Sequence, residues 1–192
     1  VDVLIEGVRE ALRLLVVGDS EVWAILRLSL LVSVSGTAAA LLLGVPAGVV
    51  LALTRFPGRQ LLVSAVNTGM GLPPVVVGLF VTILLWRSGP LGGWEILYTP
   101  AAIIIAQAVI AAPIVTGVTI AAVQSVPAAF RLQLLALGAS RMQMTWVVLQ
   151  EARLSMLAAI MAGFGGVISE IGASLMVGGN IKGSTRTLTT AT

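Results

Sequence analysis

A series of long apolar segments restricts the folds that this chain can adopt. From Val22 to Leu53 the sequence is almost continuously apolar, and comparable runs cover residues 61–86, 101–123 and 154–177. A helix needs about 20 apolar residues to cross roughly 30 Å of hydrocarbon, so each run is long enough to span a bilayer. Only 10% of the residues are charged, whereas soluble domains carry about 25%. The sequence therefore predicts an all-α, polytopic transmembrane helical bundle with four full spans.

Several classes of chemistry are excluded by what the sequence lacks. It has no Cys and no His, which removes disulfides, thiolate nucleophiles, the usual zinc ligands and the commonest general base. The pattern Gly-x-x-x-x-Gly-Lys-Ser/Thr does not occur, so no P-loop for ATP is predicted. The net charge of +3 comes without a basic run that could follow a phosphate backbone. We therefore expect no metal, no cofactor, no nucleic acid partner and no enzyme activity in this chain.

The charges outside the apolar segments predict an orientation in the membrane. Residues 1–17 are amphipathic with helical periodicity, which favours a helix lying in the membrane interface. The first loop carries Arg55 and Arg59 without an acid, and the polar insert at 124–153 carries three Arg against one Glu. Because cytoplasmic loops are enriched in Lys and Arg, both should face the cytoplasm. The N-terminus and the tail that begins at Gly178 are then expected outside.

Two features within the apolar segments predict how the helices are shaped and packed. Pro73 and Pro74 interrupt the second span, and consecutive prolines remove backbone donors and force a kink or break. In the first span, small residues recur at every fourth position, at Gly36, Ala40, Gly44 and Gly48. Such a stripe lets another helix approach closely. We expect it to serve packing within the bundle rather than a dedicated dimer seam.

The polar insert at 124–153 is the strongest indication of a partner. The segment from Pro127 to Leu137 is predicted to form a short helix, and Gly138 can supply the turn that ends it. Ser140 can then cap a second helix that begins at Arg141. A helix-turn-helix between membrane spans is a place where a subunit can present a helix to a soluble protein.

This order of helix, glycine turn, helix and span resembles the permease subunits of ABC importers. In that family the loop forms a coupling helix that docks into a groove on the ATPase. Leu137-Gly-Ala-Ser140 matches the glycine end of the family's loop pattern, whereas Leu132-Gln-Leu134 stands where Glu-Ala-Ala is usual, and Leu149-Gln150 stands where Leu-Pro is usual. The resemblance implies an ATPase-coupling loop formed by Leu135, Ala136, Leu137, Gly138, Ala139, Ser140 and Arg141.

The resemblance extends over nearly the whole chain and points to the oxyanion branch of these permeases. Four ordered motifs carry it, namely the segments 67–78, 163–173, 177–183 and 185–190. They are most similar to tungstate permeases, with molybdate permeases next. The resemblance implies a type I permease fold in a bacterial or archaeal cytoplasmic (inner) membrane, and a permease homodimer with two ATP-binding cassette ATPase subunits and an extracytoplasmic substrate-binding protein. The family has one more helix after these motifs, so we expect a C-terminal span to be missing from residues 22–192, which otherwise form a single permease domain.

The path of the anion should be lined by uncharged donors, because conduction requires binding that is weak enough to release the ion. A broken helix frees backbone donors beside a cavity. The candidates for the path or its gate lie near the predicted breaks and on the outer side; they are Asn67, Thr68, Pro73, Pro74, Ser169, Glu170, Asn180, Thr185 and Arg186. Lys182 and Arg186 could attract the anion, contact the binding protein, or be solvated cations.

Glu170 leaves a second mechanism open. It is the only acid well inside a predicted span, where an ionised carboxylate is costly and needs a partner or a proton. We favour a structural role in which Glu170 hydrogen-bonds a neighbouring helix. The alternatives are an ion-coupled secondary transporter that uses Glu170, a membrane scaffold without transport, and a sulfate or phosphate ABC permease.

Overall fold

The structure, a computed structural model, describes residues 7, 9, 13 and 16–191, and within them it is all α-helical without strands. The predicted interfacial helix over residues 1–17 lies largely outside the described residues. The helices are α2 (Ser20–Leu53), α3 (Arg59–Met70), α4 (Pro74–Leu85), the 3-10 turn η1 (Gly92–Trp94), α5 (Pro100–Ser125), α6 (Ala128–Ala136), α7 (Arg141–Glu151), α8 (Arg153–Ile168), α9 (Gly172–Gly178) and α10 (Leu188–Ala191). The all-α class predicted from the sequence is confirmed.

The described residues contain two single helices, α2 and α5, that are long and apolar enough to cross a membrane. They coincide with the predicted first and third spans. Two further spans are possible only if bent helix pairs count as one span each: α3 with α4, bent by 106°, and α7 with α8, bent by 71°. Of the four predicted spans, only two are thus unbroken helices in the described residues. The predicted fourth span is divided, because the chain leaves helical geometry between α8 and α9.

The break in the second span has the cause that the sequence indicated. Helix α3 ends at Met70 and α4 begins at Pro74, which occupies the first turn of α4. A proline is tolerated in a first turn because the N–H that it lacks has no partner within the helix there. The residue before a proline also avoids the helical region, and Pro73 is extended, with φ −60° and ψ 128°.

Helices α2 and α5 form the most extensive helix pair of the described chain, and the small-residue stripe lies between them. A Cβ added at Gly36 would lie 2.8 Å from the Cβ of Gln107, and one at Gly48 would lie 2.7 Å from the Cβ of Thr119. At these distances only glycine fits. The expectation that the stripe serves packing within the bundle is confirmed.

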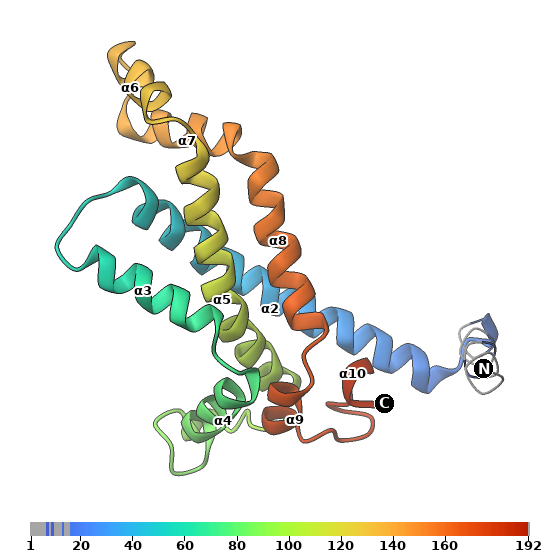
Figure 1. Cartoon of the computed structure of the whole chain (residues 1–192). Helices are drawn as coiled ribbons and strands as arrows, with labels where there is room; N and C mark the ends of the chain where they lie inside the picture. The colour runs from blue at the N-terminus through green and yellow to red at the C-terminus, as the bar shows by residue number, and fades with distance from the viewer. Residues whose placement is uncertain (1–6, 8, 10–12, 14–15, 192) are drawn as a thin grey trace.

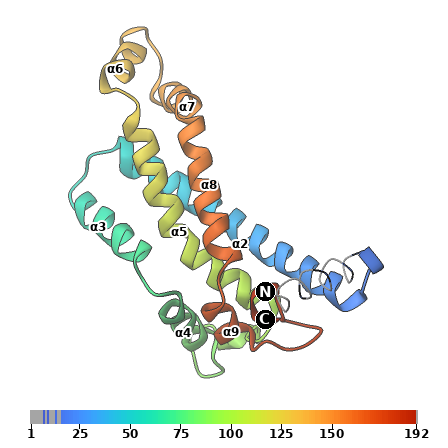
Figure 2. The same ribbon diagram turned by 45° about the vertical axis from the view of Figure 1, so that its right-hand side comes forward.

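The molecule is elongated, with α6 and α7 at one end and α4, α9 and α10 at the other (Figure 1). Helices α5 and α8 run side by side between the two ends, in contact along part of their length (Figure 2). At the lower end, α4 packs tightly on α9, where a Cβ added at Gly78 would lie 2.6 Å from the Cα of Ala173. The packed helices α5 and α8 therefore connect the helix-turn-helix of α6 and α7 to the end formed by α4, α9 and α10.

Candidate functional site

The turn between α6 and α7 has the geometry that the sequence predicts. Gly138 has φ +87°, in the left-handed region that favours glycine. Ser140 caps α7: its Oγ accepts the N–H of Gln143 at 3.2 Å, and the side chain of Gln143 accepts the N–H of Ser140 at 2.8 Å. This reciprocal capping box satisfies two donors that the helix start would leave unpaired. The predicted helix, glycine turn, serine cap and second helix are all confirmed.

A small apolar cluster holds this helix-turn-helix on the rest of the molecule. Val148 and Ala152 of the α7 end are buried against Val123 and Val126, at the end of α5. Side chains from the last turn of α2 pack on the same cluster. The helix-turn-helix therefore packs against the ends of α2 and α5.

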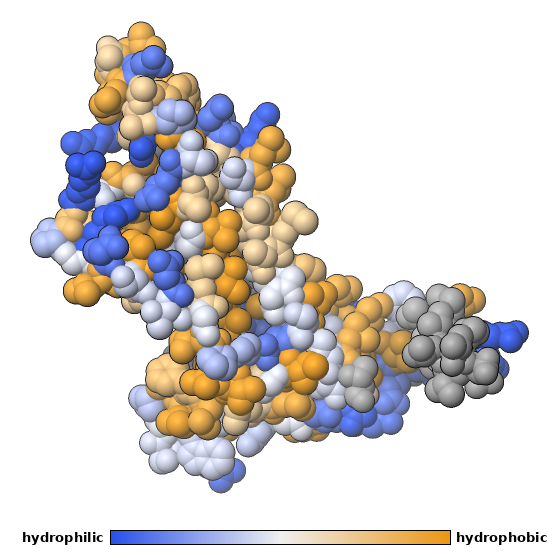
Figure 3. All heavy atoms as spheres, in the orientation of Figure 1, coloured by the Kyte–Doolittle hydropathy of each residue, from blue (hydrophilic) through white to orange (hydrophobic). Residues whose placement is uncertain are grey.

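The outer surface of the helix-turn-helix is apolar and exposed. The side chains of Leu137 and Met142 are each 85% exposed, and that of Trp146 is 63% exposed. Along α7, Met142, Trp146 and Leu149 line a shallow cavity of about 490 Å³. Hydrophobic surface is visible over the α6 end of the molecule (Figure 3). An exposed apolar patch next to polar residues is typical of a protein–protein contact surface.

At the opposite end, the structure brings the two helix breaks together. A Cβ added at Gly172, the first residue of α9, would lie 2.5 Å from Val75 at the start of α4. Glu170 lies in the break before α9, where its Oε1 accepts the N–H of Ala173 at 2.9 Å. The break at Pro73 and Pro74 and the break at Glu170 therefore belong to one region.

The position of Glu170 corrects the sequence prediction. The residue is half-buried in a break, not inside a helix, and its carboxylate caps the helix that follows it in the chain. Its backbone carbonyl accepts the hydroxyl of Thr189 at 3.1 Å. The physical reason is that the chain leaves helical geometry at Glu170 and Ile171, and α9 then begins at Gly172, close to α4. The first N–H groups of α9 have no partner within the helix, so the carboxylate can accept one of them.

The remaining candidates of the proposed path are distributed over different surfaces. Asn67 and Thr68 are exposed on α3, the helix before the first break. Ser169 is exposed as well, and its hydroxyl donates to the carbonyl of Gly165 at 2.8 Å. The hydroxyl of Ser169 is thus engaged within its own helix turn.

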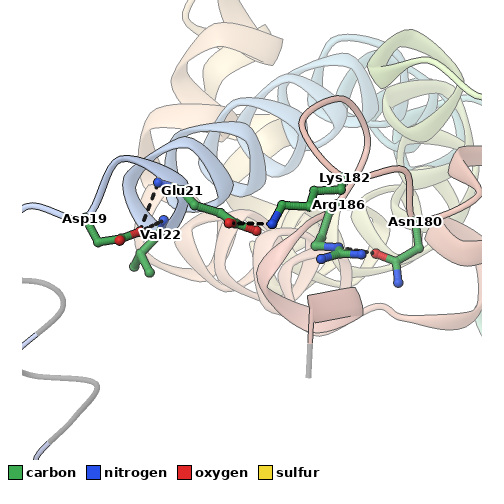
Figure 4. A network of polar contacts seen from close by, with 6 residues as sticks. All are labelled: Asp19, Glu21, Val22, Asn180, Lys182 and Arg186. Carbon is green, nitrogen blue, oxygen red and sulfur yellow. Dashed lines mark hydrogen bonds and ion pairs between the residues drawn. The ribbon is translucent and has the colours of Figure 1, made fainter.

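The tail after Gly178 is structured by polar contacts rather than freely solvated (Figure 4). Lys182 Nζ lies 2.7 Å from Glu21 Oε2, near the start of α2. Arg186 donates from Nε to Asn180 Oδ1 at 3.2 Å. Because Lys182 and Glu21 are both largely exposed, this ion pair contributes little stability. It does balance the charge of Lys182, which weakens the expectation that this residue attracts an anion.

Thr185 lies inside the tail with 1% of its surface exposed. Its hydroxyl donates to the carbonyl of Gly178 at 2.5 Å and accepts the N–H of Ile181 at 2.9 Å. The hydroxyl that the sequence suggested for the anion path is thus committed to the backbone of the tail.

Replacing Thr185 with valine is expected to destabilise the tail, because the buried carbonyl of Gly178 and the part-buried N–H of Ile181 both lose their partner. The loss at a buried group costs about 1–3 kcal/mol. Thr185→Ser keeps the hydroxyl, so the tail of this variant should stay nearly as resistant to proteolysis as that of the parent. Limited proteolysis of the tail, compared among the parent and the two variants, measures the effect. Equal cleavage rates in Thr185→Val and Thr185→Ser would contradict the assignment.

Sequence reasoning missed residues that fix the tail and the central helices. Ser29 of α2 accepts the N–H of Leu188 at 2.8 Å. Gln107 of α5 is 3% exposed and donates to the carbonyl of Val167 at 3.3 Å, beside the α8 break. A polar residue within an apolar run was the available signal, because in a membrane such a residue needs a partner.

Comparison with known proteins identifies the family of this chain. Residues 44–192 match the family described as binding-protein-dependent transport system inner membrane component, and the chain belongs to this family. It is 43% identical over 173 residues to a probable anion ABC transporter permease protein of Haloferax volcanii, covering 88% of this chain and 75% of that protein. It is 38% identical over 186 residues to the tungstate uptake system permease protein TupB of Peptoclostridium acidaminophilum, covering 97% and 82%. The TupB of Campylobacter jejuni is 31% identical over 190 residues, covering 99% and 80%.

Sulfate and molybdenum transport permeases are more distant relatives, for example at 29% and 26% identity. The chain is therefore a membrane permease subunit of an ABC importer of the oxyanion type, and the ATPase of such a system is a separate subunit. The resemblance stated from the motifs is confirmed.

Proposed function

We propose that this subunit imports tungstate, with molybdate as the nearest alternative. The support is the similarity over almost the whole chain to two proteins named as tungstate uptake permeases, against lower identity to the sulfate and molybdenum permeases. Tungstate and molybdate have nearly the same size and charge, so discrimination between them belongs to the binding protein that delivers the anion.

The coupling of transport to ATP hydrolysis is proposed to pass through the helix-turn-helix around Gly138. The observation that carries this proposal is the exposed apolar surface of Leu137, Met142 and Trp146 on a firmly anchored support. An ATPase that binds this surface can displace α7, which continues into α8 at a 71° bend. Helix α8 ends just before the break at Glu170. A displacement of α7 can therefore be transmitted along α8 to this break.

The assembly is proposed to contain two copies of the permease around one pore, two ATPase subunits and an extracytoplasmic binding protein. In this arrangement the N-terminus and the tail lie outside, and residues 124–153 face the cytoplasm. The Arg excess of the insert and of the first loop supports that orientation.

The test is ATPase activity of the subunit reconstituted in liposomes with its ATPase, with binding protein loaded with tungstate, molybdate or sulfate in turn. Stimulation by tungstate-loaded protein above the other two supports the proposal. Preferential stimulation by sulfate would contradict the tungstate assignment, and no stimulation by any loaded protein would contradict ATP-driven import of these anions.

Glu170 distinguishes this mechanism from ion-coupled transport. Because Glu170 Oε1 acts as a hydrogen-bond acceptor for Ala173, Glu170→Gln keeps an acceptor oxygen and removes only the titratable charge. We expect uptake to stay within about threefold of the parent, and Glu170→Ala, which loses the cap, to be about 1 kcal/mol less stable locally. Uptake by Glu170→Gln is measured with and without a protonophore. Loss of uptake in Glu170→Gln together with collapse of parental uptake by the protonophore would favour the ion-coupled alternative.

A further inference from the structure

A basic pocket lies where the end of α2 meets the helix-turn-helix. It has a volume of about 590 Å³ and is formed by the last turn of α2, the α2–α3 turn, the end of α5, and residues of α6 and α7. Three arginines line it: Arg55, Arg59 and Arg131. No acidic residue is among the described residues of its lining. Hydrophilic surface gathers over the end of α2 and the adjoining end of α5 (Figure 3).

The three arginines come from three separate parts of the chain. Arg55 lies in the turn after α2, Arg59 begins α3, and Arg131 is on α6. Like charges in one concavity repel each other, and the repulsion is stronger near a low-dielectric membrane than in bulk water. A bound anion would relieve it.

Arg59 is held in position within the pocket. Its Nε donates to the carbonyl of Leu51, in the last turn of α2, at 2.6 Å. This bond uses one of the five N–H donors of the guanidinium. Gln124, at the end of α5, adds an uncharged amide to the lining. Positioned guanidinium groups bind phosphate-like oxygens through paired, charge-assisted hydrogen bonds.

Membrane topology alone explains basic residues at this end but not their arrangement. Positive residues on exposed loops suffice to orient a membrane protein. Here they line a shared concavity whose volume falls in the ordinary range for ligand sites. Basic pockets between helices on the cytoplasmic side are also known to take anionic lipid head groups.

We propose that this pocket binds a tetrahedral oxyanion group, either the phosphate of an anionic lipid head group or an oxyanion free in the cytoplasm. The occupant would join α6 and α7 to the end of α2, because Arg131 lies on α6 and Met144 of α7 also lines the pocket. It would thereby hold the helix-turn-helix in a fixed position. The inference does not depend on which anion is transported, so its failure is separate from that of the transport proposal.

The experiment compares the thermal unfolding midpoint of the purified subunit in nanodiscs of phosphatidylcholine alone and of phosphatidylcholine with phosphatidylglycerol. A second arm titrates inorganic phosphate or tungstate in phosphatidylcholine nanodiscs. We expect at least one of these anionic groups to raise the midpoint by several degrees. A response only to phosphatidylglycerol assigns the group to lipid, and a response to the free anions assigns it to a soluble oxyanion. No response in either arm overturns the proposal.

Matched variants test whether the response belongs to this pocket. In Arg55→Gln/Arg131→Gln the response should fall by at least threefold, and in Arg131→Lys, which keeps the charge and hence the topology signal, it should fall less. Arg87→Gln removes an exposed arginine that lies outside this pocket, and its response should match the parent. Each variant's midpoint in phosphatidylcholine alone shows whether it is folded. An equal loss of response in Arg87→Gln, or none in the double variant, contradicts the proposal.

Discussion

Replacing Gly138 with valine is expected to reduce ATP-driven uptake by about tenfold or more while leaving the subunit inserted in the membrane. Gly138 has φ +87°, and a Cβ at this position would meet no atom within 4 Å. The obstacle is therefore the backbone conformation and not a steric clash. A β-branched residue in the left-handed region costs about 1–3 kcal/mol. The turn would relax to another conformation and displace the exposed side chains of Leu137 and Met142 from the proposed contact surface for the ATPase.

The matched control is Gly138→Asn, because asparagine adopts the left-handed conformation far more readily than valine. Uptake and the amount of ATPase that copurifies should fall about tenfold or more in Gly138→Val and much less in Gly138→Asn. Membrane levels of both variants should equal the parent, since the turn lies outside the apolar segments. Full uptake by Gly138→Val would show that the turn does not couple the subunits.

Replacing Gly48 with leucine is expected to destabilise the helix bundle strongly. A Cβ at Gly48 would lie 2.7 Å from the Cβ of Thr119 and 2.9 Å from the carbonyl oxygen of Thr116. The carbonyl belongs to the backbone of α5, so it cannot yield by a change of rotamer. Helices α2 and α5 would have to separate over their main contact, which costs about 3 kcal/mol or more.

Ala38→Leu is the control for this change, because Ala38 lies on the exposed side of the same helix. The thermal unfolding midpoint in detergent should fall by about 10 °C or more in Gly48→Leu and by little in Ala38→Leu. A comparable midpoint in both variants would mean that α2 and α5 do not pack through the small-residue stripe.

Local features of the sequence were sufficient for several structural predictions. The double proline predicted the break between α3 and α4 because proline lacks an N–H, whatever surrounds it. Gly138 and Ser140 predicted the turn and the cap of α7, since both depend on the conformation and hydrogen bonds of neighbouring residues. The apolar runs predicted α2 and α5, and the motifs predicted the family, which the comparisons confirmed.

Other features depended on contacts between segments far apart in the sequence. The run from 154 to 177 is apolar apart from Glu170 and a few serines, yet it is divided, because α9 packs closely on α4 through Gly78 and Ala173. For the same reason Glu170 caps a short helix instead of lying within a long one. Hydropathy reports the preference of each residue for the membrane and contains no information about which helix approaches which.

The helical class, the family, the first break and the turn at Gly138 follow from the residues alone. The folded structure was needed to show that the two breaks meet at one end, that Lys182 is paired with Glu21, and that Arg55, Arg59 and Arg131 line one pocket. The difference lies in the range of the interactions. Backbone conformation and capping are settled within a few residues, whereas ion pairs and pockets depend on where the folded chain places residues that are distant in sequence.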